Sequence, residues 1–237
     1  MRLFGIDGCR AGWVVISSDY CLRDIRSRVL ESGDIASFFR QRHLAGDRVA
    51  IDIPIGLADG ASRSCDQAAR QLLGWPHSSS VFSAPCRLTL QATSYAEACA
   101  INRKVSGRGI SKQTYGILPK IREIDAALES AMQGTVRESH PEVLFARLSC
   151  GGRGLAPSKK SPEGRIVRLE LLHRYLPRFD PAMIRIGLGR ASVALDDVID
   201  AGACLIAAKH IAEGTAAVLP QGSLERDARG LRMEIVA

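Results

Sequence analysis

Several acidic residues stand where carboxylates could meet and do chemistry. Asp7 and Asp52 each end a short hydrophobic run, Leu-Phe-Gly-Ile-Asp and Val-Ala-Ile-Asp, and Glu138 follows a third such run. One hydrophobic strand that ends in a carboxylate is common, but three in one chain are not. If the strands lie side by side, their acids meet at one edge and can hold divalent cations. This pattern predicts a metal-dependent phosphoryl-transfer enzyme, with a nuclease as the leading hypothesis.

A second acidic cluster, Asp196, Asp197 and Asp200, lies in an expected helix near the end of the chain. Asp200 follows the other two by four and three residues, so it shares a helical face with each of them. Like charges at this spacing destabilise a helix unless a positive group lies between them. Mg²⁺ or Mn²⁺ would supply that charge, because hard cations prefer carboxylate and water oxygens.

Each acid also has an ordinary structural explanation. Asp7 and Asp52 can end strands through Asx turns, and Glu138 can be a surface residue. Asp196 can be a late N-cap, and Asp197 can be a first-turn acid favoured by the helix dipole. The joint occurrence of these acids, rather than any one of them, favours a site.

The elements that must position the acids form an α/β pattern. Strands are expected at residues 2–6, 12–17, 22–30, 48–53 and 135–139, with helices at 34–43, 63–73, 95–104, 112–132, 163–175 and 192–213, one more from Pro141, and weaker strands at 216–220 and 231–236. The first three strands read as an antiparallel meander, and a right-handed crossover leads to the fourth. Residues of about 60–133 read as a mostly helical insertion between the fourth and fifth strands.

We therefore expect one domain over residues 1–237, built on a five-stranded mixed sheet in the order 3-2-1-4-5 and flanked by helices. In that order the first, fourth and fifth strands are parallel neighbours, so Asp7, Asp52 and Glu138 all lie at their carboxyl ends. Ligand sites of open α/β sheets lie at that edge.

The composition is that of an ordinary globular protein, with 46% apolar and 24% charged residues in 237. The chain begins without the basic and apolar runs of a signal peptide, and it has no apolar segment long enough to span a bilayer. Its seven cysteines are an odd number without a Cys-x-x-Cys pair, which fits reduced thiols. We expect a cytoplasmic protein with no membrane partner.

The net charge of +7 favours a polyanionic partner, because clustered Lys and Arg attract phosphates. Nucleic acid, either DNA or RNA, is the partner that best fits both this charge and the acidic residues. The sequence leaves open a homo-oligomer.

Seven short blocks of the sequence suggest a family. They are GIDGCRAGW at 5–13, IDIPIGL at 51–57, RSCD at 63–66, SVFSAP at 80–85, GILPKI at 116–121, ESHPE at 138–142 and DDVIDA at 196–201. Together they closely resemble the domain-of-unknown-function family 429, whose members are predicted RNase H-like nucleases. The resemblance runs from about residue 4 to residue 212.

The resemblance implies an RNase H-like fold of the Holliday-junction-resolvase type, with acids from the first strand, the fourth strand and the terminal helix. Asp7, Asp52 and one or both of Asp197 and Asp200 would be the catalytic metal ligands, with Glu138 as an added or alternative one. Two Mg²⁺ or Mn²⁺ ions would polarise the phosphate and activate water.

Basic residues inside the family-like blocks are the candidates for contact with substrate phosphates. Arg63 and Lys120 are the first choices, because both lie in blocks that resemble the family. His140 is a third candidate, although a packing or capping role is the more ordinary explanation. The basic residues outside the blocks, Lys159 among them, are weaker candidates, and a solvated surface is the more ordinary explanation for each of these lysines.

Two other functions stay open. An actin-like or sugar-kinase-type phosphotransferase shares the sheet topology, and Gly8 and Gly12 faintly resemble its phosphate-binding turn, but that class duplicates the fold and one copy is present here. Alternatively, the chain is a non-catalytic module that binds nucleic acid and whose acids only position a structural ion. Tight ATP binding would favour the first, and saturable binding without turnover would favour the second.

Overall fold

The computed structural model describes residues 1–60, 62–149, 151–222 and 224–237. Its strands are β1 (Arg2–Cys9), β2 (Gly12–Asp19), β3 (Arg26–Leu30), β4 (Arg48–Ile51), β5 (Val136–Glu138), β6 (Val218–Leu219) and β7 (Ile235–Val236). Its α-helices are α1 (Ile35–Leu44), α2 (Ser64–Leu73), α3 (Tyr95–Ser106), α4 (Lys112–Ala127), α5 (Pro141–Leu148), α6 (Pro162–His173), α7 (Pro181–Leu188) and α8 (Leu195–Glu213). Short 3₁₀ helices lie at His77–Ser80, Arg87–Gln91 and Ser130–Gly134.

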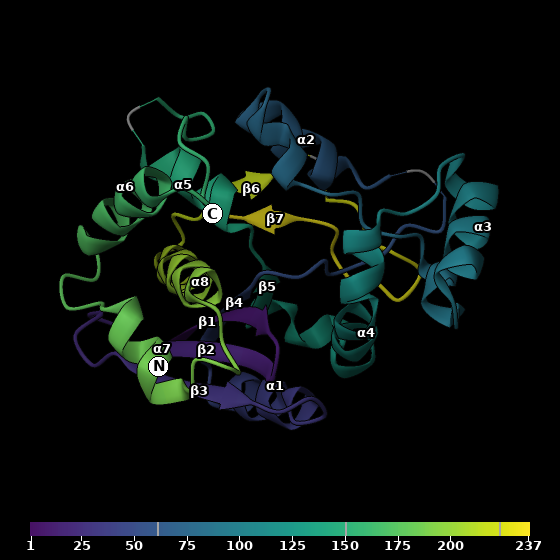
Figure 1. Cartoon of the computed structure of the whole chain (residues 1–237). Coiled ribbons are helices and arrows are strands. Elements are labelled where there is room, and N and C mark those ends of the chain that lie inside the picture. The colour runs from purple at the N-terminus through teal and green to yellow at the C-terminus, as the bar shows by residue number, and fades with distance from the viewer. Residues whose placement is uncertain (61, 150, 223) are drawn as a thin grey trace.

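The main sheet has five strands in the order β3-β2-β1-β4-β5, which confirms the predicted topology. β1, β2 and β3 pair antiparallel, whereas β4 runs parallel to both β1 and β5. The segments between β4 and β5 are helical, as expected for the insertion. Helices α3 and α4 lie together at the right of the view, whereas α2 lies above the sheet, near α5 and β6 (Figure 1). The three parallel strands therefore end at a common edge.

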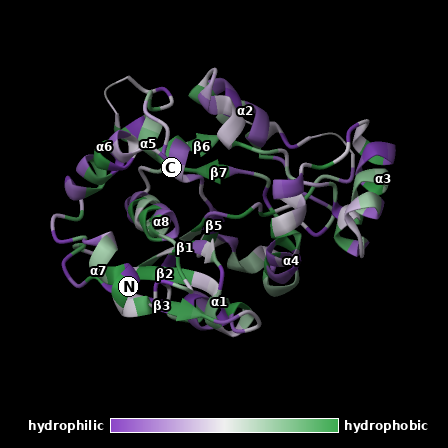
Figure 2. Cartoon of the chain, viewed as in Figure 1, coloured by the Kyte–Doolittle hydropathy of each residue, from purple (hydrophilic) through white to green (hydrophobic). Residues whose placement is uncertain are grey.

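Alternating side chains of the strands pack against helices on both faces of the sheet. Leu3, Val14 and Ile16 face a core that contains α8, whereas Phe4 and Ile6 face a second core that contains α1 and the buried side of α4. Helix α8 accordingly lies on one face and α1 on the other (Figure 1). β1 and β2 are largely hydrophobic, whereas hydrophilic and hydrophobic residues are mixed along α2 and α3 (Figure 2). A small third cluster, formed by Ala92, Ala98 and Ile110, lies under α3.

The third strand begins later than residue 22, where the sequence placed it. Leu22 has a left-handed backbone with φ of 59°. The Asp19 carboxylate accepts hydrogen bonds from the backbone N–H groups of Arg23 and Asp24, which closes a turn over this segment. The strand starts only after that turn, at Arg26.

Some helix limits also differ from the expectation. The helix expected to reach residue 132 ends at Ala127 and is followed by a separate 3₁₀ turn, while it continues through Pro119. Helix α7 was not predicted. Asp180 caps it by accepting from the N–H groups of Ala182 and Met183, and Pro181 occupies its first turn. An Asp-Pro pair is a normal helix start, so this signal was present in the sequence.

The last strands, expected at 216–220 and 231–236, form a short antiparallel pair, β6 with β7. Val236 makes a parallel bridge to Ser139, so β7 lies beside the end of β5. The six cysteines that the structure describes are free thiols, and Cys150 lies outside the described residues. None of the described helices has the length and apolar character needed to cross a bilayer.

Candidate active site at the carboxyl edge of the sheet

Asp7 and Asp52 lie beside each other because β1 and β4 are parallel and in register. Ile6 pairs with Ile51, and the Asp52 N–H donates to the carbonyl of Ile6 at 2.9 Å. One oxygen of Asp7 accepts from the N–H of Gly8 at 2.7 Å, which fixes the carboxylate at its own strand. The two strands thus present both acids at one edge, as the sequence predicts.

Helix α8 brings the third acid to this edge through a close contact with Gly5. A Cβ on Gly5 would lie 2.1 Å from both the Ala201 carbonyl oxygen and the Leu205 nitrogen, so the helix backbone touches the strand there. Gly5 precedes Asp7 by two residues and shares its side of β1. Since Asp200 is next to Ala201, this contact sets Asp200 opposite Asp7.

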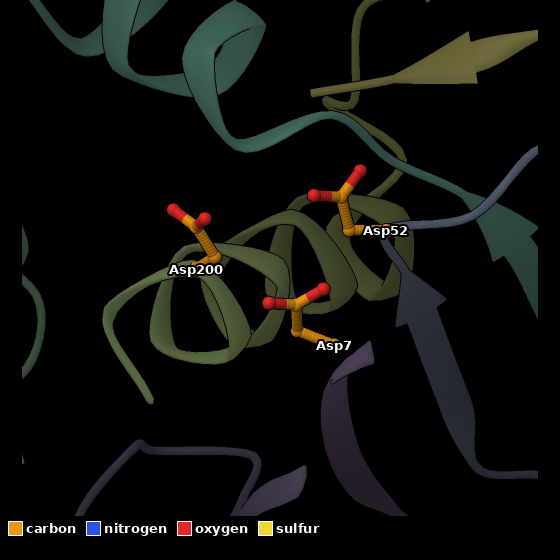
Figure 3. Close-up of side chains that lie close together, drawn as sticks. All are labelled: Asp7, Asp52 and Asp200. Atoms are coloured by element: carbon orange, nitrogen blue, oxygen red, sulfur yellow. The ribbon is translucent and has the colours of Figure 1, made fainter. Parts of the chain in front are cut away.

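One carboxylate oxygen from each of Asp7, Asp52 and Asp200 lies within 4.8 Å of the others. The three carboxylates lie near one another, on side chains that come from β1, from the end of β4 and from α8 (Figure 3). The donor set suits Mg²⁺ or Mn²⁺, which prefer oxygen ligands at about 2.0–2.2 Å and hence opposite ligands about 4 Å apart. Small side-chain movements would close the three oxygens around one such ion.

Lys159 enters the same site from the loop between α5 and α6. Its Nζ lies 3.0 Å from Oδ2 of Asp200. Burial alone lowers the pKa of this ammonium, but the carboxylates of Asp200, Asp52 and Asp7 raise it above the usual value, so Lys159 stays charged. The sequence favoured a solvated surface for Lys159. No spacing rule predicts a contact between a lysine in a glycine-rich loop and an aspartate 41 residues later in the chain.

Burial and mutual repulsion make the three acids hard to ionise. Burial is the largest cause and raises the pKa of Asp7 well above its usual range, and the nearby carboxylates of Asp52 and Asp200 add to it. Burial likewise raises the pKa values of Asp52 and Asp200 to about 6, although the Lys159 ammonium opposes both shifts. In this state protons compete with a cation for the carboxylates.

Asp197 lies next to the trio rather than within it. Its Oδ2 accepts from the N–H of Ala194 at 2.8 Å and so caps the first turn of α8. Burial raises its pKa, and its charge acts on Asp7, which places it near the site. Asp196 points elsewhere and pairs with Arg165 at 3.3 Å. The N-cap is Ala194, so Asp196 is not the late N-cap considered above.

Glu138 and Arg63 have a different arrangement from the one that the sequence suggested. Arg63 donates to both oxygens of Glu138, at 2.7 and 2.8 Å, and to Asp66 at 2.5 Å, and all three side chains are buried. The N–H of Ile55 also donates to Glu138 at 2.6 Å. Burial lowers the pKa of Arg63, but the two carboxylates reverse this and raise it well above normal. This geometry supports a structural ion pair, which argues against a metal ligand at 138 and a phosphate contact at 63.

Lys120 packs onto the hairpin between β1 and β2. Its Nζ donates to the Gly12 carbonyl at 2.5 Å and lies 4.6 Å from the centre of the Trp13 ring. A Cβ on Gly8 would come within 2.9 Å of its side chain, and a Cβ on Gly12 would lie 2.2 Å from the Leu30 carbonyl. Packing therefore accounts for both glycines that resembled a phosphate-binding turn.

His140 lines a cleft of about 490 Å³ that also includes Asp52 and Lys159, with Phe82 and Gln113 in its wall. Its Nε2 lies 3.4 Å from the Ser80 carbonyl, while its buried Nδ1 has no hydrogen-bond partner among the described residues. Burial lowers the pKa of His140, so its neutral form is favoured at neutral pH. Asp52 and Lys159 thus connect the acidic trio to a cleft with space for a substrate.

The fold and this site define an α/β protein with a cluster of carboxylates at the carboxyl edge of a mixed sheet. The chain belongs to the family described as "Protein of unknown function (DUF429)", whose model matches residues 5–225. This confirms the family that the seven sequence blocks resemble. Searches among curated proteins and among solved structures found no significant match to the chain.

Proposed function

We propose that this protein is a metal-dependent nuclease of the RNase H-like type that hydrolyses phosphodiester bonds of DNA or RNA. The observation that carries the proposal is the convergence of Asp7, Asp52 and Asp200 to within 4.8 Å. The order β3-β2-β1-β4-β5, with acids from the first strand, the fourth strand and a late helix, is the arrangement that the resemblance implies. The free thiols fit action in the cytoplasm.

The residues of the site fit a divalent cation by their chemistry and their spacing. Asp7, Asp52 and Asp200 would hold Mg²⁺ or Mn²⁺, and the charge of Asp197, which acts on Asp7, would add to the negative field around the cation. When bound, the cation supplies Lewis-acid activation of water and of the phosphate. Hydrolysis joins a water oxygen to phosphorus, breaks the bond from phosphorus to one ester oxygen, and moves one water proton to that leaving oxygen.

Three further features of the chain support a substrate that contains phosphate. The cleft beside Asp52 gives a phosphate access to the site, and Lys159 lies at their junction. The net charge of +7 favours approach of a polyanion. This charge also supports nucleic acid over a small neutral substrate.

The test compares wild type with Asp7→Asn on single- and double-stranded DNA and RNA in Mg²⁺ and in Mn²⁺. Removal of an outer partner of a metal ligand costs roughly 10–100-fold, so loss of a ligand should lower cleavage by more than about 100-fold. Asp34→Asn is the matched control, because Asp34 is exposed beside α1 and its side chain makes no capping bond. Equal cleavage by wild type and Asp7→Asn would reject the assignment, and saturable binding without cleavage would favour a binding module.

A further inference from the structure

Lys159 is held at the acidic trio by a closed turn. The N–H and the hydroxyl of Ser161 both donate to the Ser158 carbonyl, at 2.9 and 3.0 Å. Ser161 Oγ also accepts from the N–H of Gly164 at 3.0 Å and so caps α6. Since Lys159 lies between Ser158 and Ser161, the start of α6 fixes where its side chain begins.

The buried side chain of Arg168 also holds the segment that leads into this turn. Arg168 donates to both oxygens of Glu142, at 2.8 and 2.6 Å, and to the Pro157 carbonyl at 3.1 Å. A Cβ on Gly164 would lie 1.9 Å from the Ser158 carbonyl, so the turn rests directly on the helix. These contacts distinguish Lys159 from a mobile surface lysine.

The Lys159 ammonium neutralises part of the negative charge of the aspartates and occupies one carboxylate oxygen of Asp200. A pair of metal ions would need both that negative charge and that oxygen. The three aspartates carry three negative charges when ionised, and one divalent ion together with Lys159 neutralises them. A second divalent ion would leave two positive charges in excess over the trio. The neighbouring Asp197 would offset one of them, so one would remain uncompensated in a partly buried site, which is unfavourable. Oδ2 of Asp200 already accepts a hydrogen bond from Lys159. Two metal ions about 3.5–4 Å apart would need free carboxylate oxygens that both ions can bind.

We propose that the Lys159 ammonium occupies the place of a second cation, so that the trio binds a single divalent ion. This inference rests on the proposed function and departs from the two-ion mechanism expected from the sequence. In the reaction, Lys159 donates a hydrogen bond to the phosphate oxygen that a second ion would otherwise coordinate. It is therefore a substrate-contacting residue at the junction of the trio and the cleft.

The test is a titration with Mn²⁺ alone, read by electron paramagnetic resonance of free Mn²⁺ and by calorimetry. Wild type should bind one Mn²⁺ per chain. Lys159→Met removes the charge with little change in length, and it should bind two. Lys159→Arg keeps the charge and should stay at one.

Lys160→Met is the matched control, because it removes one positive charge from an exposed neighbour in the same turn, and it should bind one ion. Thermal unfolding checks that every variant is folded. Lys159→Gln, which also removes the charge and should bind two ions, retains the test if Lys159→Met does not fold. Two ions in wild type, or one in folded Lys159→Met, would overturn the role of Lys159 and leave the nuclease proposal intact. No saturable Mn²⁺ in wild type would overturn both.

Discussion

Asp7, Asp52 and Asp200 repel one another in the absence of a cation, so these residues reduce the stability of the fold that holds them. Lys159 relieves this repulsion in part through Asp200. Asp7 has its pKa raised well above normal by burial and by its neighbours, which makes its ionisation the least favourable. Residues kept at a cost to stability are typical of functional sites.

Asp7→Asn should therefore stabilise the metal-free protein while it abolishes Mn²⁺ binding. The amide removes the repulsion but keeps an oxygen for the N–H of Gly8. We expect a rise in melting temperature of roughly 2–4 °C at pH 8, which corresponds to about 1 kcal/mol for a chain of this size. Calorimetric unfolding with and without Mn²⁺ measures both effects, and a lower melting temperature without metal would contradict the role of repulsion.

The raised pKa values also predict how pH controls metal binding. Because Asp52 and Asp200 titrate near pH 6 when folded, protons compete with the cation below that pH. We expect Mn²⁺ affinity to increase by roughly 10- to 100-fold between about pH 5 and pH 7, with proton release on binding. Titrations in buffers of different ionisation enthalpy count those protons, and an affinity independent of pH would argue against these ligands.

The same shifts determine the sign of the stability change. A folded pKa above the unfolded value means that the folded state binds more protons. These acids therefore lower the stability of the metal-free protein as pH rises from the unfolded pKa of about 4 through about 6. Saturating Mn²⁺ should remove that decrease.

Glu138 differs from the trio in its partner rather than in its pKa. Burial raises its pKa to about 7, although Arg63, which pairs with both of its oxygens, opposes the shift. Glu138→Gln should destabilise the protein by about 3 kcal/mol, since buried Arg63 would lose the charge of its bidentate partner and keep only the Asp66 carboxylate and the carbonyls of Ile55 and Gly56. Mn²⁺ binding by the folded variant should be unchanged. Urea unfolding and the Mn²⁺ titration separate the two properties. Native stability with lost Mn²⁺ binding would instead make Glu138 a ligand.

At the scale of elements, the site depends on how closely α8 approaches β1. Gly5→Ala should destabilise the protein by roughly 2–4 kcal/mol, because the methyl group would overlap the backbone of α8. The helix must move away, so Mn²⁺ affinity should fall as well. Both changes are measured by denaturant unfolding and by Mn²⁺ titration.

Gly116→Ala is the control for that substitution. Gly116 lies within α4, and a Cβ there has nothing within 4 Å. Alanine should leave stability unchanged or increase it by up to about 1 kcal/mol. If Gly5→Ala behaved like Gly116→Ala, the close approach would not be what positions Asp200.

The sequence was sufficient to predict most elements that position the site, because hydrophobic runs, capping residues and glycines are local signals. Asp7 and Asp52 follow from strand ends, and Asp200 from helical spacing. Lys159 and the pairing of Glu138 with Arg63 could not be predicted, since each depends on a contact between distant segments of the chain. The local sequence around a strand-end carboxylate is the same whether a metal ion or an arginine from a distant segment binds it.

At the scale of the whole molecule, the predicted order of strands follows from short connections and a right-handed crossover. The insertion was predicted only as a helical stretch, and its attachment was not. Arg63 attaches α2 to the end of β5 through Glu138, so the insertion begins with a segment bound to the sheet. This ion pair joins the start of α2 to the sheet, and the chain that follows α2, from Pro76 to Phe82, lines the cleft together with His140.

Helix α3 packs on the small cluster of Ala92, Ala98 and Ile110 rather than on either main core. A segment with so little apolar burial should open as a separate cooperative unit, without unfolding of the sheet. Amide protons of α3 should therefore exchange with deuterium faster than those of α8, which mass spectrometry can resolve by peptide. Equal protection of both helices would instead indicate that the whole chain unfolds in one step.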